Sequence, residues 1–242
     1  LDEIHMTMNA YLNFNIHKPK VFNTGRISSN DQHAVVVASG PSLRDNIELL
    51  KKNRERYTLF CCYSTIGGLI EHGIIPDYHC DLERHNDHVP LINRGIVDEL
   101  KQIDLLASST ADPRLLALYK SVYTINRGAL TPSVIYSESN DIISNEGPDV
   151  ATFAMLCAKY FGFRTIHLFG VDLGTATRTI NRLPNALDID RRVYDVPDRG
   201  NFGRTVFTNQ HLIDNKKAIE HNISLYSQIF PDLKFFNYSN GL

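Results

Sequence analysis

The sequence lacks the marks of several large classes of protein. No apolar run approaches the roughly 18 residues that a membrane-spanning helix needs, and there is no internal repeat or low-complexity tract. The formal net charge of −2 gives no electrostatic reason to expect nucleic acid as a partner. No signal peptide is visible, and Leu1 is not a natural start. We therefore expect a domain of a longer chain, with no membrane span and no nucleic-acid partner.

Cysteine is also scarce. The four cysteines are Cys61, Cys62, Cys80 and Cys157; two of them are adjacent, and three stand in apolar, strand-like runs. Such a pattern is not typical of the disulfide framework that many small secreted proteins use. It favours a reduced, cytoplasmic setting.

What the chain does contain is a regular alternation of apolar strands and amphipathic helices. Residues 34–38 form a continuous apolar run of the kind that a strand buried on both faces requires. Further strands are expected over residues 57–62, 77–81, 104–109, 121–125, 165–169 and 234–238, and helices over 42–53, 64–72 and 210–229 and after Asp112 and Asp149. The alternation predicts an α/β, Rossmann-like fold whose mostly parallel sheet carries helices on both faces.

The pattern also divides the chain. Residues 1–33 are polar and mixed, and we interpret them as an N-terminal appendage that joins an upstream region. Residues 34–242 form the Rossmann-like domain, with a glycine-rich, charged insertion near 173–208 that is a candidate lid.

The first turn after a predicted strand is Ser39-Gly40-Pro41-Ser42. Gly40 permits a close backbone approach, the two serines offer hydroxyls, and the start of the next helix favours an anion. The turn matches neither the dinucleotide-binding glycine motif nor the P-loop, and it has no lysine. These residues alone leave open whether the turn binds a phosphate or only redirects the chain.

Other polar residues follow later strands. Tyr63 and Ser64 come after the second strand, where Ser64 could also be a simple helix cap, and Asp81 ends the third. Histidines and carboxylates gather around Asp81 in "PDYHCDLERHNDH", but alternation along the strand separates them, so no metal site is predicted there. Asp172 follows a buried strand, where it could orient a ligand or hold the next loop.

A second turn, "SNEGPDVAT", precedes a helix. Gly147, Pro148 and the backbone up to Thr152 could receive a phosphate or carboxylate, although Asp149 could already cap that helix. In the candidate lid, Arg199, Arg204 and the neighbouring Arg191, Arg192 and Tyr194 could meet an anionic substrate or form a solvated loop.

Five segments in order resemble one known family. "VVVASGPSL", "HGIIPDYHCDLE", "YFGFRTIHLFGVDLG", "GNFGRTVFTN" and "FFNYSNGL" look like the central domain of the Maf motility-associated factors, over about residues 34–242. The same domain is similar to bacterial CMP-sialic-acid sialyltransferases and to an archaeal pterin diphosphokinase. The resemblance implies transfer of a nonulosonic acid, of pseudaminic, legionaminic or sialic type, from a CMP-activated donor to flagellin serine or threonine.

The resemblance also implies roles for particular residues. Ser39, Gly40, Pro41 and Ser42 would form the nucleotide-phosphate turn, although sialyltransferases carry asparagine where Ser39 stands. Tyr63, Ser64 and Asp81 would lie near the nucleotide, and Gly147, Pro148, Asp149 and Thr152 near the donor. The expected catalytic residues are His211, as general base, and Asp172, at the ribose end. Arg199 and Arg204 would bind the anionic substrate.

Two alternatives stay open. The first is an ATP- and Mg²⁺-dependent enzyme like the 6-hydroxymethylpterin diphosphokinases, with Asp81 as a metal contact. The second is a non-catalytic flagellin-binding module that keeps the fold. Transfer from a CMP-activated sugar itself requires no further cofactor; Mg²⁺ belongs to the first alternative only.

Overall fold

The structure is a computed structural model. It describes residues 2–24, 29–85, 88–128, 130–136, 138, 141–144, 147, 149–178, 183, 185–187 and 193–242. The strands are β1 (Lys20–Val21), β2 (Asn30–Val37), β3 (Tyr57–Cys62), β4 (Tyr78–Asp81), β5 (Asp104–Ser108), β6 (Ser121–Arg127), β7 (Ile142–Ile143), β8 (Phe163–Phe169), β9 (Val196–Arg199), β10 (Thr205–Thr208) and β11 (Lys234–Asn237).

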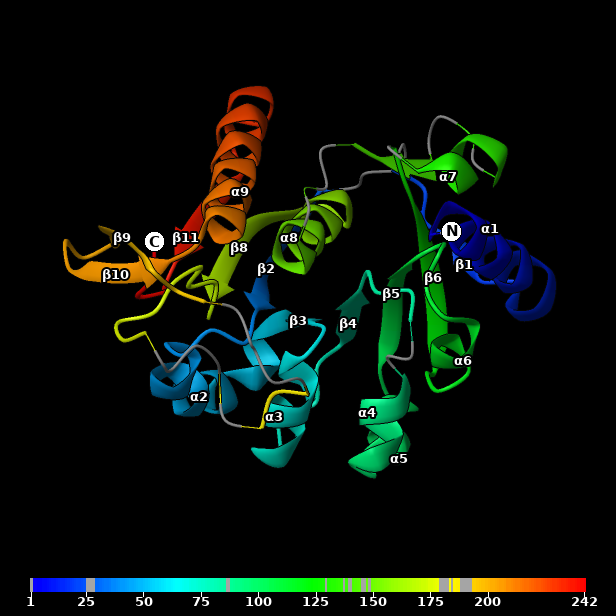
Figure 1. The fold of residues 1–242 in the computed structure, drawn as a ribbon, viewed down its shortest axis with the longest axis horizontal. Helices are drawn as coiled ribbons and strands as arrows, with labels where there is room; N and C mark the ends of the chain where they lie inside the picture. Colours follow the sequence, from blue (N-terminus) through cyan, green and yellow to red (C-terminus); the bar gives the residue numbers. More distant parts are fainter. Residues whose placement is uncertain are drawn as a thin grey trace.

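The helices alternate with the strands along most of the chain (Figure 1). They are α1 (Asp2–Leu12), α2 (Leu43–Lys52), α3 (Thr65–Glu71), α4 (His88–Asn93), α5 (Val97–Leu100), α6 (Pro113–Leu116), α7 (Thr131–Tyr136), α8 (Val150–Tyr160) and α9 (Gln210–Ile229), with a π-helix at Asn13–His17 and a 3₁₀ turn at Arg54–Arg56.

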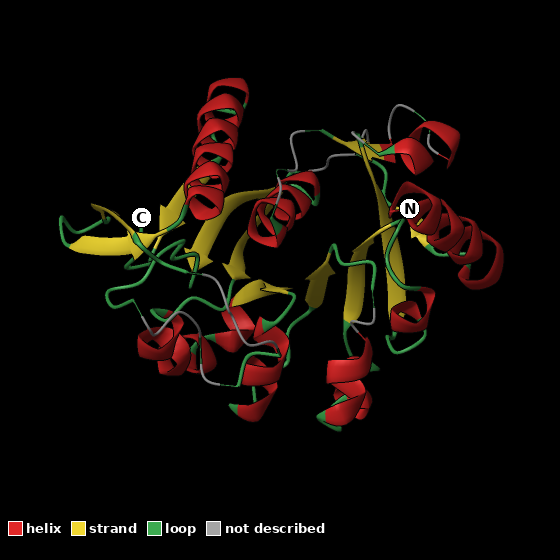
Figure 2. Ribbon diagram, in the orientation of Figure 1, coloured by secondary structure: helices red, strands yellow, loops and turns green. Residues whose placement is uncertain are grey.

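The main sheet runs in the order β1-β6-β5-β4-β3-β2-β8-β11, with β7 beside β6. Every pairing in it is parallel, whereas β9 and β10 form a separate antiparallel pair. Figure 2 shows helices on both faces of the sheet. The predicted Rossmann-like architecture is therefore confirmed.

The alternation of side chains along each strand builds two apolar cores. Val36 and Phe60 face α8 and α9, whereas Val35, Val37 and Leu59 face α2 and α3. A strand in the middle of such a sheet must be apolar at every position, which explains the continuous run in β2. All four cysteines are buried and free, in agreement with the prediction that they form no disulfide framework.

The N-terminal segment lies against the far edge of the sheet. β1 pairs with β6, and the Asn13 amide donates to the carbonyls of Ser109 and Ala111 at 3.0 and 2.9 Å. β2 begins at Asn30, four residues before the predicted start of the strand. The division of the chain at residue 33 stays a prediction.

Among the described residues, none of the helices has both the length and the apolarity to cross a membrane.

Candidate functional site

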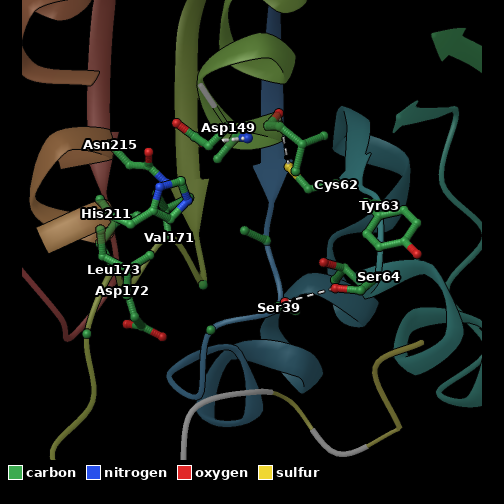
Figure 3. Close-up of a pocket in the computed structure, with 18 of the residues that line it drawn as sticks. Ser39, Cys62, Tyr63, Ser64, Asp149, Val171, Asp172, Leu173, His211 and Asn215 are labelled. Atoms are coloured by element: carbon green, nitrogen blue, oxygen red, sulfur yellow. Dashed lines mark hydrogen bonds between the residues drawn. The ribbon is translucent and has the colours of Figure 1, made fainter. Parts of the chain in front are cut away.

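A cavity of about 270 Å³ opens beyond the carboxyl ends of β2, β3 and β8. The chain runs from β2 through β3 to β6 on one side of the sheet and returns to β8 on the other side of β2. Ligands of open α/β sheets bind where the strand order reverses in this way. Of the predicted site residues, the cavity brings together Ser39, Gly40, Tyr63, Ser64, Asp149, Asp172 and His211 (Figure 3).

The turn after β2 is held against the turn after β8. Gly40 N donates to Gly170 O at 2.8 Å, and a Cβ on Gly40 would overlap both Gly170 O and Asp172 Oδ2. Ser42 N donates to Asp172 Oδ2 at 2.8 Å, and Asn240 N donates to Asp172 Oδ1 at 2.9 Å. A carboxylate of the chain itself therefore occupies the first turn of α2, and Asp172 joins three segments that are distant in sequence.

The turn after β3 meets the turn after β2 through hydroxyl groups. Ser64 precedes α3 but makes no side-chain cap to that helix; instead its Oγ donates to Ser39 Oγ at 3.2 Å. Figure 3 shows this contact on the side of the pocket opposite His211. Ser64 is thus part of the pocket wall rather than the simple helix cap that the sequence left open.

The described part of the candidate lid also contacts these two turns. Leu183 N donates to Ser39 O at 2.7 Å, and Leu187 N donates to Ser64 O at 2.9 Å. Tyr194, from the same insertion, lines the cavity. Arg191 and Arg192 lie outside the described residues.

His79 supports the turn after β3 from behind. It is fully buried, with Nε2 2.9 Å from Tyr63 O and Nδ1 2.5 Å from the Tyr119 hydroxyl. Because a carbonyl oxygen only accepts, Nε2 carries the proton and Nδ1 accepts from Tyr119. Burial lowers the pKa of His79 to about 4, since a charged imidazole would lose its hydration there.

This burial predicts a loss of stability in mild acid. An unfolded histidine takes up a proton near its ordinary pKa of 6.5, whereas folded His79 stays neutral until about pH 4. The unfolded state therefore binds more protons in this window, so stability is full above pH 6.5 and falls as the pH drops towards 4. From about pH 7.5 to about pH 5, His79 should account for about 2 kcal/mol of lost unfolding free energy.

Urea unfolding at both pH values measures this effect. His79→Gln removes the titrating group, so the pH-dependent loss should be about 2 kcal/mol smaller than in the wild type. Equal pH-dependent losses in the two proteins would contradict the assigned burial and protonation of His79.

Asp149 caps α8, as the sequence suggested. Its Oδ1 accepts from Ala151 N at 2.8 Å and Thr152 N at 3.0 Å, and its Oδ2 accepts from the Thr152 hydroxyl at 2.6 Å. Burial raises the pKa of Asp149, and these hydrogen bonds and the nearby His211 lower it in part. The N-termini of α2 and α8 are thus both occupied by carboxylates of the chain.

α9 contributes two polar side chains to the cavity, His211 and Asn215. His211 is exposed, whereas Asn215 is only 3% exposed. Residues four apart lie on one face of a helix, and Figure 3 shows both side chains on the same side of the pocket. Asn215 was not among the residues predicted from the sequence; its spacing of four from His211 was the available signal.

The remaining predicted residues lie elsewhere. Pro41, Ser42 and Arg204 line a second cavity of about 400 Å³, which shares Asp172 and Gly174 with the first. Four lie outside the described lining of both cavities: Asp81, Gly147, Thr152 and Arg199. Pro148 lies outside the described residues.

Asp81 and its neighbours spread apart rather than converge. Asp81 is fully buried and its Oδ1 accepts from Glu83 N at 2.8 Å, while His85 faces Asp2 and His88 faces Asp112. Within the described ranges, no three histidine, cysteine or acidic side chains are grouped as they would be to hold a metal ion.

The wall of the first cavity carries acidic side chains but no lysine or arginine among its described residues. The acidic side chains are those of Glu83, Asp149 and Asp172. Burial raises the pKa of Asp172 as it does that of Asp149. Such a wall favours ligands with little negative charge, or anions accompanied by a cation.

Comparison with known proteins identifies a solved structure that is similar to this chain over its whole length. The chain is similar to the Maf glycosyltransferase from Magnetospirillum magneticum AMB-1, with 30% sequence identity and a TM-score of 0.84. The match covers 100% of this chain but only 37% of that protein. The comparison with curated proteins finds no match.

The family described as "6-hydroxymethylpterin diphosphokinase MptE-like" matches this chain over residues 5–178. This match and the structural likeness to the Maf protein confirm the resemblance and the pterin-kinase relation predicted from the five segments. The chain belongs to the 6-hydroxymethylpterin diphosphokinase MptE-like family.

Proposed function

We propose that this chain is the donor-binding and catalytic region of a glycosyltransferase. In the proposed reaction, a nonulosonic acid moves from a CMP-activated donor to a serine or threonine of flagellin. The observation that carries the proposal is the cavity at the strand-order reversal, in a fold that matches a Maf glycosyltransferase at a TM-score of 0.84. A shared fold alone does not fix a reaction, so the chemistry of the cavity has to support it.

The proposed step needs a base, a leaving group and an acceptor. The acceptor hydroxyl oxygen forms a bond to the anomeric carbon, and the bond from that carbon to the phosphate oxygen breaks, leaving its electron pair on CMP. The hydroxyl proton passes to His211, which is exposed in the first turn of α9 and lines the cavity. The carboxylate of Asp149 lies near enough for its pKa to respond to His211, and so would stabilise the imidazolium that forms.

The other residues have binding and positioning roles in this proposal. The hydroxyls of Ser39 and Ser64 are the neutral hydrogen-bonding groups at the donor end. Asp172 positions the turn through Ser42 N rather than contacting the reacting atoms. Arg204 borders the adjoining cavity, where the carboxylate of the sugar could reach it, and the exposed Arg199 would act only on an acceptor outside both cavities.

The charge of the cavity favours this donor over ATP. A CMP-activated nonulosonic acid carries about two negative charges, on the phosphodiester and on the sugar carboxylate, whereas ATP carries about four that Glu83, Asp149 and Asp172 would repel. We propose that this donor binds without a metal ion. The family match to residues 5–178 supports the diphosphokinase alternative, which in this cavity would need Mg²⁺ with ATP.

A thermal-shift experiment distinguishes the glycosyltransferase from the diphosphokinase alternative. At a CMP concentration about 100 times its Kd, binding should raise the melting temperature by about 5 to 10 °C without Mg²⁺. ATP should give no shift, with or without Mg²⁺.

Two results would contradict the proposal. A shift that requires both ATP and Mg²⁺ would establish the diphosphokinase alternative. The second result combines two assays. If no CMP compound raises the melting temperature, but the chain still captures flagellin in a pull-down, the chain would be a non-catalytic flagellin-binding module.

A further inference from the structure

Asn215 is a buried amide in the cavity wall with unused hydrogen-bonding capacity. Its side chain lines the cavity, and no residue that the structure describes donates to its covered Oδ1. A buried polar atom left without a partner costs about 1–3 kcal/mol. Such a side chain at a cavity wall is therefore poised to bond to a ligand.

Thr65 repeats this feature from another element. It stands at the start of α3, is fully buried and lines the same cavity, and its Oγ1 has no partner among the described residues. Two neutral, unpartnered groups therefore line a cavity whose described wall holds no lysine or arginine. Recognition in this cavity rests on hydrogen bonds rather than on basic side chains.

The position of Asn215 indicates which part of the ligand it meets. A polypeptide acceptor cannot enter a cavity of about 270 Å³, so the new bond must form at its mouth, where His211 is exposed. Asn215 lies one helical turn further along α9 and is buried. The group left in the interior when the sugar departs is the nucleotide.

We propose that Asn215 is a specificity-determining residue whose amide hydrogen-bonds the base of that nucleotide. The inference rests on the proposed function. A primary amide offers one acceptor and one donor side by side, and cytosine offers the complementary pair in its N4 amino group and N3. Rotation of the amide exchanges its oxygen and nitrogen, so either can face the cavity.

Two leucine variants on the same helix test this inference. Asn215→Leu removes the amide and keeps the number and branching of the side-chain heavy atoms. Asn222→Leu is the matched control, because Asn222 is also buried on α9 but lies outside the described lining of both cavities. Calorimetric titration of each folded variant with CMP, and with ribose 5-phosphate to millimolar concentration, separates base contacts from sugar and phosphate contacts.

We expect Asn215→Leu to weaken CMP binding about tenfold and Asn222→Leu to leave it within about twofold of the wild type. Ribose 5-phosphate should bind the wild type and Asn215→Leu alike, or bind neither. Unchanged CMP affinity in Asn215→Leu, or an equal loss of affinity for ribose 5-phosphate, would overturn the proposed role of Asn215 but not the proposed function. Wild-type protein that binds no CMP would overturn the proposed function, and the inference with it.

Discussion

Replacing His211 by glutamine should lower the rate of sugar transfer by about 100- to 10,000-fold, because a positioned general base contributes about that factor. Glutamine keeps a polar side chain of similar reach but takes up no proton. The imidazole lies at the exposed start of α9, so CMP affinity should stay within about twofold of the wild type. The loss should therefore fall on the transfer step.

Single-turnover transfer from a CMP-activated nonulosonic acid to flagellin, in the full-length protein, measures this effect. His221→Gln provides the control, because His221 is exposed on the same helix but lies outside the described lining of the cavity. Transfer that survives His211→Gln within about tenfold would remove His211 from the role of base. A loss of CMP affinity that accounts for the whole effect would make it a binding residue instead.

Replacing Asp172 by alanine should reduce the free energy of unfolding by about 2 to 5 kcal/mol. The change removes the acceptor of Ser42 N and of Asn240 N, and each buried N–H group left unpaired costs about 1–3 kcal/mol. The turn at Ser39 and Gly40 would also lose its anchor, so CMP affinity should fall together with stability.

Urea unfolding of Asp172→Ala and Asp172→Asn tests whether the carboxylate holds the turn in place. Asparagine keeps one of the two oxygen acceptors but turns its NH2 group towards the other N–H, so it should lose about half as much stability as alanine. If alanine costs less than about 0.5 kcal/mol, Asp172 does not hold the turn. If Asp172→Asn keeps CMP binding but abolishes transfer, Asp172 would act in catalysis, as the sequence analysis predicted, and not only in positioning the turn.

Much of the fold could be predicted because it depends on local patterns. The buried runs of β2, β3 and β8 and the long helix α9 were located within a few residues of their observed bounds. Asp112 and Asp149 were predicted as caps, and both accept from backbone N–H groups two residues ahead. Strand burial and helix capping depend on neighbouring residues, so a single sequence carries them.

The site was only partly predictable. Polar residues after strands were the right place to look, because parallel strands bring their carboxyl ends to one edge. That rule found Ser39, Tyr63, Ser64 and Asp172 in the cavity wall, but it also selected Asp81, which is buried beside its own loop. A residue that follows a strand can face the cavity or the core, and the packing of the neighbouring elements decides which.

The sequence by itself determined that this is a parallel α/β domain whose motifs resemble those of the Maf proteins, and it predicted a ligand site beyond the strand ends. Only the tertiary structure decided that the Ser39–Ser42 turn is closed by Asp172, a residue 130 positions away from Ser42. It also decided that Ser64 bonds to Ser39, and that Asn215 Oδ1 stands in the wall without a partner among the described residues. These contacts join segments that no local pattern connects, because they form only when β2, β3, β8 and α9 come together.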